Sequence, residues 1–137
     1  MSDTPPVIRR FLSAWSDRDP QLAGNEVTPD VTITDPYGTT EGPAGLIEHL
    51  DVILRRFDFT PASVTNCFVD GDLASDARLA FVLNCPMKGR SSRVLGLETG
   101  FEAGVFVQLR GGKIHTWTEY WDPAPLARTL VEASKQA

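Results

Sequence analysis

The chain has 137 residues, of which 42% are hydrophobic and 23% are charged, and its formal net charge is −5. This size and composition are typical of one globular domain, so we expect residues 1–137 to form a single domain. An acidic chain of this kind is a poor candidate for binding nucleic acid or an anionic membrane surface. No apolar run reaches membrane-spanning length, and the first residues do not resemble a signal peptide, which favours a cytoplasmic protein.

The cysteines and histidines show no metal-binding or redox spacing. Cys67 and Cys85 are separated by a long interval, as are His49 and His115, so we expect free thiols, no metal and no cofactor. The basic run at residues 88–93 is interleaved with glycine and serine, and we interpret it as a solvated loop.

Helical segments are predicted mainly in the first half of the chain. The first begins at the proline pair 5–6, is capped by one of residues 2–4, and ends before Pro20. A short second helix is predicted over residues 20–27, and a third begins at Gly42-Pro43. The apolar stripes of the first and third helices are Ile8, Phe11, Leu12 and Trp15, and Leu46, Ile47, Leu50, Ile53, Leu54 and Phe57.

The rest of the chain has the alternating pattern of β-strands. We predict strands over residues 31–35, 62–69, 73–83, 101–110 and 113–122, a longer turn over 84–97, and a last short helix beginning at Pro123 or Pro125. Helices grouped on one side of a bent, mostly antiparallel sheet define an α+β domain.

The last predicted strand contains a carboxylate between two tryptophans. Side chains alternate across a strand, so Trp117, Glu119 and Trp121 share one face, which we expect to be buried. A buried carboxylate shifts its pKa or finds a partner, which makes Glu119 a candidate catalytic acid or base. The alternative is a structural carboxylate that holds an arginine or a backbone N–H group.

A second carboxylate, Asp35, ends the first predicted strand. It shares a face with Val31 and Ile33 and is followed by a proline, so its alternative role is an Asx turn. His49 lies near the margin of the third helix's apolar stripe, a position more typical of a half-exposed helix residue than of a catalytic one.

The order of elements and several short motifs resemble the nuclear-transport-factor-2-like superfamily, in particular its SnoaL-like polyketide cyclases and its limonene-type and polyether epoxide hydrolases. The motifs are residues 11–15 (FLSAW), 31–38 (VTITDPYG), 112–114 (GKI) and 117–122 (WTEYWD). The resemblance covers nearly the whole chain. It implies a cone-shaped barrel in which a bent sheet wraps around three to four helices and leaves an internal pocket.

The resemblance also assigns roles to individual positions. Asp35-Pro36 matches the general base of ketosteroid isomerases, whose oxyanion donors would fall at Phe11 and near Ala103 or Gly104, where no donor is present. The arginine of limonene-type epoxide hydrolases matches Arg78, and its two aspartates fall at Glu119 and Ala80. The pair of positions that this sequence keeps, Asp35 and Glu119, is similar to the pair of pocket carboxylates in polyether epoxide-opening enzymes.

We therefore expect Asp35 and Glu119 to face each other, one ionised and one protonated, with Arg78 close to one of them. Tyr37 and His49 would add hydrogen bonds at the mouth of an apolar pocket. The remaining predicted substrate-binding residues are Trp15, Leu50, Leu54, Phe101, Ala103, Trp117 and Trp121.

The expected function is cofactor-independent acid/base chemistry on an apolar polyketide- or terpene-like molecule, by epoxide hydrolysis or cyclisation. The alternatives are an aldol cyclase or double-bond isomerase that uses Asp35 alone, and a non-catalytic module that binds a small molecule. Relatives in the superfamily commonly pair through the outer face of the sheet, which implies a homodimer with Thr116, Thr118 and Tyr120 at its interface.

Overall fold

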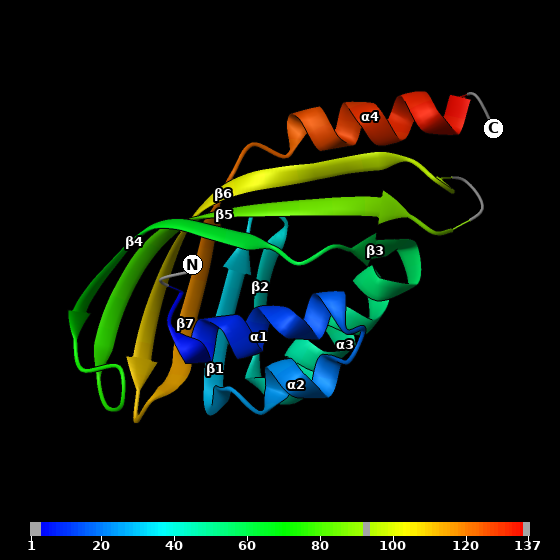
Figure 1. Cartoon of the computed structure of the whole chain (residues 1–137). Helices are drawn as coiled ribbons and strands as arrows, with labels where there is room; N and C mark the ends of the chain where they lie inside the picture. Colours follow the sequence, from blue (N-terminus) through cyan, green and yellow to red (C-terminus); the bar gives the residue numbers. More distant parts are fainter. Residues whose placement is uncertain (1–3, 92–93, 136–137) are drawn as a thin grey trace.

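The computed structural model describes residues 4–91 and 94–135, and within them one curled sheet bends around a layer of helices (Figure 1). Helices α1 (Pro6–Ser16), α2 (Pro20–Gly24) and α3 (Gly42–Arg56) gather on the inner side of the bend. Helix α4 (Ala124–Lys135) lies along strand β6, on the side away from α1, α2 and α3. The predicted α+β class is confirmed.

The helices form where the sequence places their apolar stripes and prolines. Helix α1 begins after Pro5, which has no side chain that could cap it; of the predicted caps, Ser2 and Asp3 lie outside the described residues. Helix α2 is capped by the carboxylate of Asp19, which accepts a hydrogen bond from the Gln21 N–H group at 3.1 Å. It ends at Gly24, earlier than predicted, because residues from Val27 onward join the sheet.

The sheet contains seven strands in the order β2-β1-β7-β6-β5-β3, with β4 also paired to β5. The neighbouring pairs are antiparallel, apart from β1 and β7, which run parallel. The strands are β1 (Val27–Asp35), β2 (Gly38–Glu41), β3 (Phe57–Phe59), β4 (Ser63–Gly71), β5 (Ala77–Gly89), β6 (Glu98–Arg110) and β7 (Lys113–Tyr120).

Two predicted boundaries around β5 are wrong. The strand begins at Ala77 rather than at residue 73, because Asp72 organises a turn in which its carboxylate accepts the Ala74 N–H group at 2.9 Å. It then continues to Gly89, through much of the segment predicted as a turn, so Lys88 of the basic run belongs to the sheet. Pro86 is tolerated because it falls between the stretches of β5 that pair with β4 and with β3, an edge-like position.

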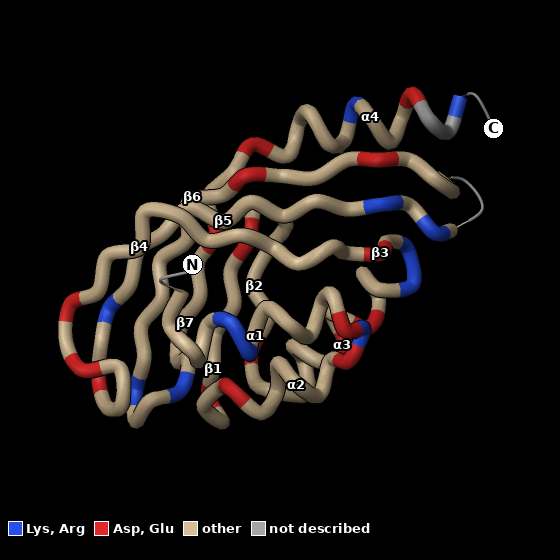
Figure 2. Tube along the Cα trace, viewed as in Figure 1, with Lys and Arg blue, Asp and Glu red and all other residues tan. Residues whose placement is uncertain are grey.

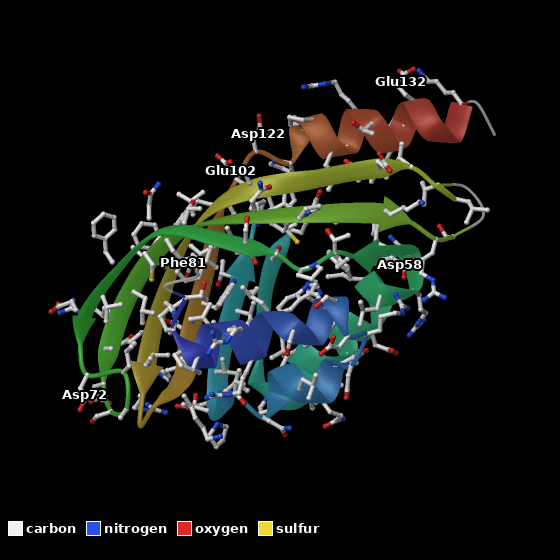
Figure 3. The ribbon with its side chains drawn as sticks, in the orientation of Figure 1. Asp58, Asp72, Phe81, Glu102, Asp122 and Glu132 are labelled. Atoms are coloured by element: carbon white, nitrogen blue, oxygen red, sulfur yellow. The ribbon has the colours of Figure 1, made fainter. Side chains whose placement is uncertain are left out.

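The core lies between α1, α3 and the inner face of the sheet. Strand β5 turns Leu79, Phe81 and Leu83 inward, as its alternation predicts, and Phe81 packs its ring 5.6 Å from that of Trp117 (Figure 3). Charged residues collect at hairpin ends and on the outer turns of the helices, while the central strands are largely uncharged (Figure 2). None of the described helices has both the length and the apolar character that crossing a membrane requires.

Candidate active site

The parallel pairing of β1 with β7 brings the two predicted carboxylates side by side. The register aligns Ile33 with Trp117 and Thr34 with Thr118, so the next position aligns Asp35 with Glu119. Ile33 and Trp117 both point into the core, and side chains two residues further along each strand share that face. Neighbouring strands are roughly 4.8 Å apart. Asp35 and Glu119 therefore lie next to each other on the inner face of the sheet, at the carboxyl ends of β1 and β7.

The carboxylate of Glu119 is held by the two tryptophans that flank it in the sequence. Trp117 Nε1 donates to Oε1 at 3.0 Å, and Trp121 Nε1 donates to Oε2 at 3.1 Å. Glu119 as a whole is half-buried, while its carboxylate is largely shielded from water. Burial raises the pKa of Glu119, the nearby charge of Asp35 raises it further, and the indole hydrogen bonds only partly offset these effects. Glu119 is thus the carboxyl group that favours the protonated state.

The environment of Asp35 shifts its pKa in the opposite direction to that of Glu119. Burial alone would raise the pKa of Asp35, but hydrogen bonds from His49 and from the Tyr37 N–H group outweigh it, and the net shift is downward. Its Oδ2 lies 3.5 Å from Nε2 of His49, and its Oδ1 accepts the Tyr37 N–H group at 2.8 Å. The Asx turn that we considered as an alternative role is therefore present, and it leaves the other oxygen to His49.

His49 is closer to the centre of the site than the sequence indicated. The hydrogen bond with Asp35 raises the pKa of His49, burial opposes this, and the negative charges of Asp35 and Glu119 add to the rise. His49 directly precedes the buried Leu50 and lies one turn before the half-buried Ile53, and its Nε2 reaches Asp35 at the end of β1. A helix residue at the edge of an apolar stripe gives no sequence signal for such a partner, because the contact depends on how α3 packs.

An aromatic group surrounds the entrance to these three side chains. Trp121 stacks on Phe101, with ring centroids 4.5 Å apart and an interplanar angle of 14°. Tyr37 meets the same indole edge-on at 5.7 Å and is 65% exposed. Phe101 and Trp121 are half-buried, and together with Tyr37 they form an aromatic rim beside Glu119.

The interior behind this rim is packed with side chains. Trp117 is 1% exposed and contacts the ring of Phe11 at 4.7 Å, and Trp15 packs edge-on against the same ring. The other predicted lining residues Leu50, Leu54 and Ala103 are also buried. These residues form the floor and core beneath the site rather than the wall of an open pocket. A cavity among the described residues lies elsewhere, between α1 and the segment that leads into β4.

The predicted place of Arg78 is wrong. Strand β5 buries Ala77 and Leu79, so Arg78 between them points outward, and its side chain is 79% exposed. It lies 3.9 Å from Asp70 across the β4–β5 hairpin, on the face opposite the carboxylate pair. The side chain that faces Asp35 is instead the imidazole of His49. Among residues 4–91 and 94–135, no group of three histidine, cysteine or acidic side chains is placed to hold a metal ion.

The helices and the curled sheet form an α+β cone, a fold similar to that of a protein described as ketosteroid-isomerase-like. Residues 8–117 match the model of the SnoaL-like domain, and the chain is a member of that family. No protein with a curated function matches the sequence significantly.

Three solved structures illustrate the range of similar proteins. A ketosteroid-isomerase-like protein from Catenulispora acidiphila in complex with trimethylamine has a TM-score of 0.73 at 16% identity, with 87% of each chain covered. An epoxide hydrolase of the limonene type from M. tuberculosis has a TM-score of 0.67 at 16% identity, with 93% of this chain and 88% of the other covered. A protein from Xanthomonas campestris, named as a candidate polyketide cyclase, has a TM-score of 0.66 at 15% identity, with 90% and 93% covered. The TM-scores establish a shared fold, but the sequence identities are too low to transfer a reaction, which must therefore be argued from the site.

Proposed function

We propose that this protein is a cofactor-independent acid/base enzyme that opens an epoxide in an apolar small molecule. The observation that carries the proposal is the adjacent pair of carboxyl groups, whose pKa values are pushed apart, with Glu119 raised and Asp35 lowered. Paired titratable groups with separated pKa values are the usual basis for dividing acid and base roles in one site.

In the proposed reaction, Asp35 accepts a proton from the nucleophile, which is either water or a hydroxyl group of the substrate. The nucleophile forms a new C–O bond while the epoxide C–O bond breaks, and Glu119 donates its proton to the epoxide oxygen. Its two indole bonds occupy one lone pair on each oxygen, so a carboxyl proton has room beside them. A proton then returns from Asp35 to Glu119 through solvent or His49, which restores the starting state.

The substrate class follows from the rim of the site. Its exposed surface consists mainly of the rings of Tyr37, Phe101 and Trp121, which favour an apolar or unsaturated molecule such as a terpene- or polyketide-like epoxide. The structural similarity to an epoxide hydrolase and to a candidate polyketide cyclase is consistent with this choice. Hydrolysis would give a diol, whereas attack by an internal hydroxyl would give a ring.

Two other functions have an observation in their favour. The Asp35–His49 pair at the end of β1 could serve alone as the base of an aldol cyclase or double-bond isomerase, as in the ketosteroid isomerases that this fold resembles. The packed interior and the full engagement of Glu119 by two indoles would equally suit a module that binds a small molecule without converting it.

The proposal is tested with a panel of terpene and aliphatic epoxides and three variants. Asp35→Asn and Glu119→Gln should each lower turnover at least about a hundredfold, because each removes one positioned acid or base. Glu102→Gln is the matched control, since Glu102 is an exposed carboxylate on β6 (Figure 3). Full activity in either site variant would remove that residue from the mechanism.

The product distinguishes the candidate reactions. In water labelled with ¹⁸O, hydrolysis places the label in a diol, whereas isomerisation and internal cyclisation leave the product unlabelled. A ligand that stabilises the protein without any product, together with unchanged binding by Glu119→Gln, would identify the non-catalytic module instead.

A further inference from the structure

A concave site lies on the far side of α1 from the carboxylate pair. It is a partly open cavity of about 520 Å³, within the range of small-molecule pockets. One wall is the face of α1 that carries Arg9, Leu12 and Ser16, which recur at helical spacing. The other wall is the segment that leads into β4, with Ala62, Ser63 and Val64.

This cavity is distinct from the candidate active site. None of its lining residues belongs to the group formed by Asp35, His49, Glu119 and the aromatic rim. Helix α1 separates the two regions, because its opposite face buries Phe11 against Trp117. A molecule bound here would therefore leave the carboxylate pair unoccupied.

The lining combines apolar surface with a single cationic group. Arg9 is exposed, and no carboxylate among the described residues pairs with it, whereas the neighbouring Arg10 is bound to Glu26 at 2.8 Å. Ser16 and Ser63 also line the cavity, and their hydroxyl groups can donate hydrogen bonds to a ligand. The guanidinium group of Arg9 favours an anion over a neutral or cationic molecule at this place, although the chain as a whole carries a net charge of −5.

We propose that this cavity binds a small amphipathic anion with a carboxylate head and an aliphatic chain. The guanidinium group of Arg9 suits the two oxygens of a carboxylate, and the serine hydroxyls can complete its hydrogen bonds. The aliphatic chain would cover Leu12, Ala62 and Val64, which supply the apolar part of the lining.

The test uses octanoate as the probe and ¹⁵N-labelled protein observed by NMR. Octanoate should bind with a Kd in the millimolar range or tighter and shift amide signals of α1 and of residues 61–64. Arg9→Gln should weaken binding about tenfold. Ala62→Phe, which fills the cavity, should abolish it. Arg128→Gln is the matched control, because Arg128 is an exposed arginine on α4 that lies outside the cavity.

Two further probes isolate the charge preference. Octylamine and 1-octanol carry the same chain without the carboxylate, and both should bind more weakly than octanoate. Equal affinity for octanoate and octylamine, shifts centred on Glu119, or saturation that Arg9→Gln leaves unchanged would overturn the proposal, as would the absence of any shift. The spectra of the unliganded variants show directly whether each one is folded.

Discussion

At the scale of single residues, the most informative group is Glu119, because its hydrogen bonds and its protonation compete. Its two oxygens satisfy the only polar atoms of two partly or fully buried indoles, which is a structural role. The same enclosure keeps water away and raises the pKa of the carboxyl group, which is the property of a catalytic acid. The side chain of Glu119 therefore both satisfies the two indole N–H groups and supplies a carboxyl group with a raised pKa.

The raised pKa of Glu119 predicts how stability changes with pH. The unfolded chain releases this proton near its ordinary pKa of 4.5, whereas the folded protein keeps it to higher pH. The folded state thus loses stability relative to the unfolded state as the pH rises through this window, by at most about 1.4 kcal/mol per pH unit. Glu119→Gln lacks this loss, so its stability relative to the original protein should improve from pH 5 to pH 8.

Urea unfolding of both proteins at a series of pH values measures this difference. Both retain Asp35 and His49, so the contribution of that pair cancels to first order. A constant difference across the range would mean that Glu119 is ionised in the folded protein, and it would remove its role as an acid. The variant also replaces one acceptor by a donor, which should lower stability by about 1–3 kcal/mol at all pH values.

Local patterns in the sequence identify residues whose relation lies within one strand, whereas contacts that depend on tertiary packing cannot be predicted from such patterns. Alternation along a single strand was enough to place Glu119 between Trp117 and Trp121, because that relation is local. The contact of Asp35 with His49 joins a strand end to a helix, and no local pattern encodes it. Arg78 was misplaced because a match to a family position was preferred to the alternation of β5, which places it outside.

At the scale of elements, the helical layer is tied together by Arg18. This residue follows α1 with a positive φ of 54°, an uncommon conformation outside glycine. Its Nη2 donates to the carbonyl of Leu54 at 2.6 Å, and its Nη1 lies 2.8 Å from Oδ1 of Asp58. The side chain joins the turn between α1 and α2 to the end of α3.

Arg18→Met should therefore destabilise the protein by about 1–3 kcal/mol, because it leaves carbonyl groups at the end of α3 without their charged donor. Arg55→Met is the control: Arg55 pairs with Asp51 one turn earlier on the exposed surface, and the loss of this pair should cost about 0.5 kcal/mol or less. Denaturant unfolding of the two variants compares them directly. Equal effects would show that the Arg18 contacts add no more than a surface pair.

The elements that the sequence predicted well are those with long periodic patterns. The inward faces of β5 and β6 follow their alternation, and most of the apolar stripes of α1 and α3 is buried, while Trp15, Ile47 and Ile53 are half-buried. Strands β2 and β3 have only four and three residues, too few for a period to emerge. Their pairing depends on the neighbouring strand rather than on their own composition, which is why they were not predicted.

At the scale of the whole molecule, the outer face of the sheet carries an exposed apolar row. The strand registers place Phe68, Ala80, Phe106 and Thr118 across β4, β5, β6 and β7 in turn. Phe68 is 72% exposed, Phe106 is 55% exposed, and Tyr120 packs edge-on against Phe106 at 5.7 Å. Exposed aromatic groups at the centre of a sheet favour a partner surface, and a second copy remains our prediction.

Phe106→Glu should convert a homodimer into a monomer, because two like charges would face each other near the twofold axis of such an interface. Sedimentation equilibrium gives the mass of each form. Leu95→Glu is the control, since Leu95 is an exposed apolar residue on the connection between β5 and β6 and lies outside the row. A monomeric original protein, or a dimer that tolerates Phe106→Glu, would contradict the expected interface.

The parallel contact between β1 and β7 also governs the order in which the molecule can be made. Strand β1 can pair with β2, and β4, β5 and β6 with one another, as they leave the ribosome, but the pairing of β1 with β7 must wait for almost the entire remaining polypeptide. Until then the ring of Phe11 has no Trp117 to cover it on the nascent chain. Translation that stops short of β7 would release a fragment with exposed apolar surface, which quality-control proteases and chaperones recognise. This fragment would lack Trp117, which covers the core, and Glu119, one of the two carboxyl groups of the candidate site.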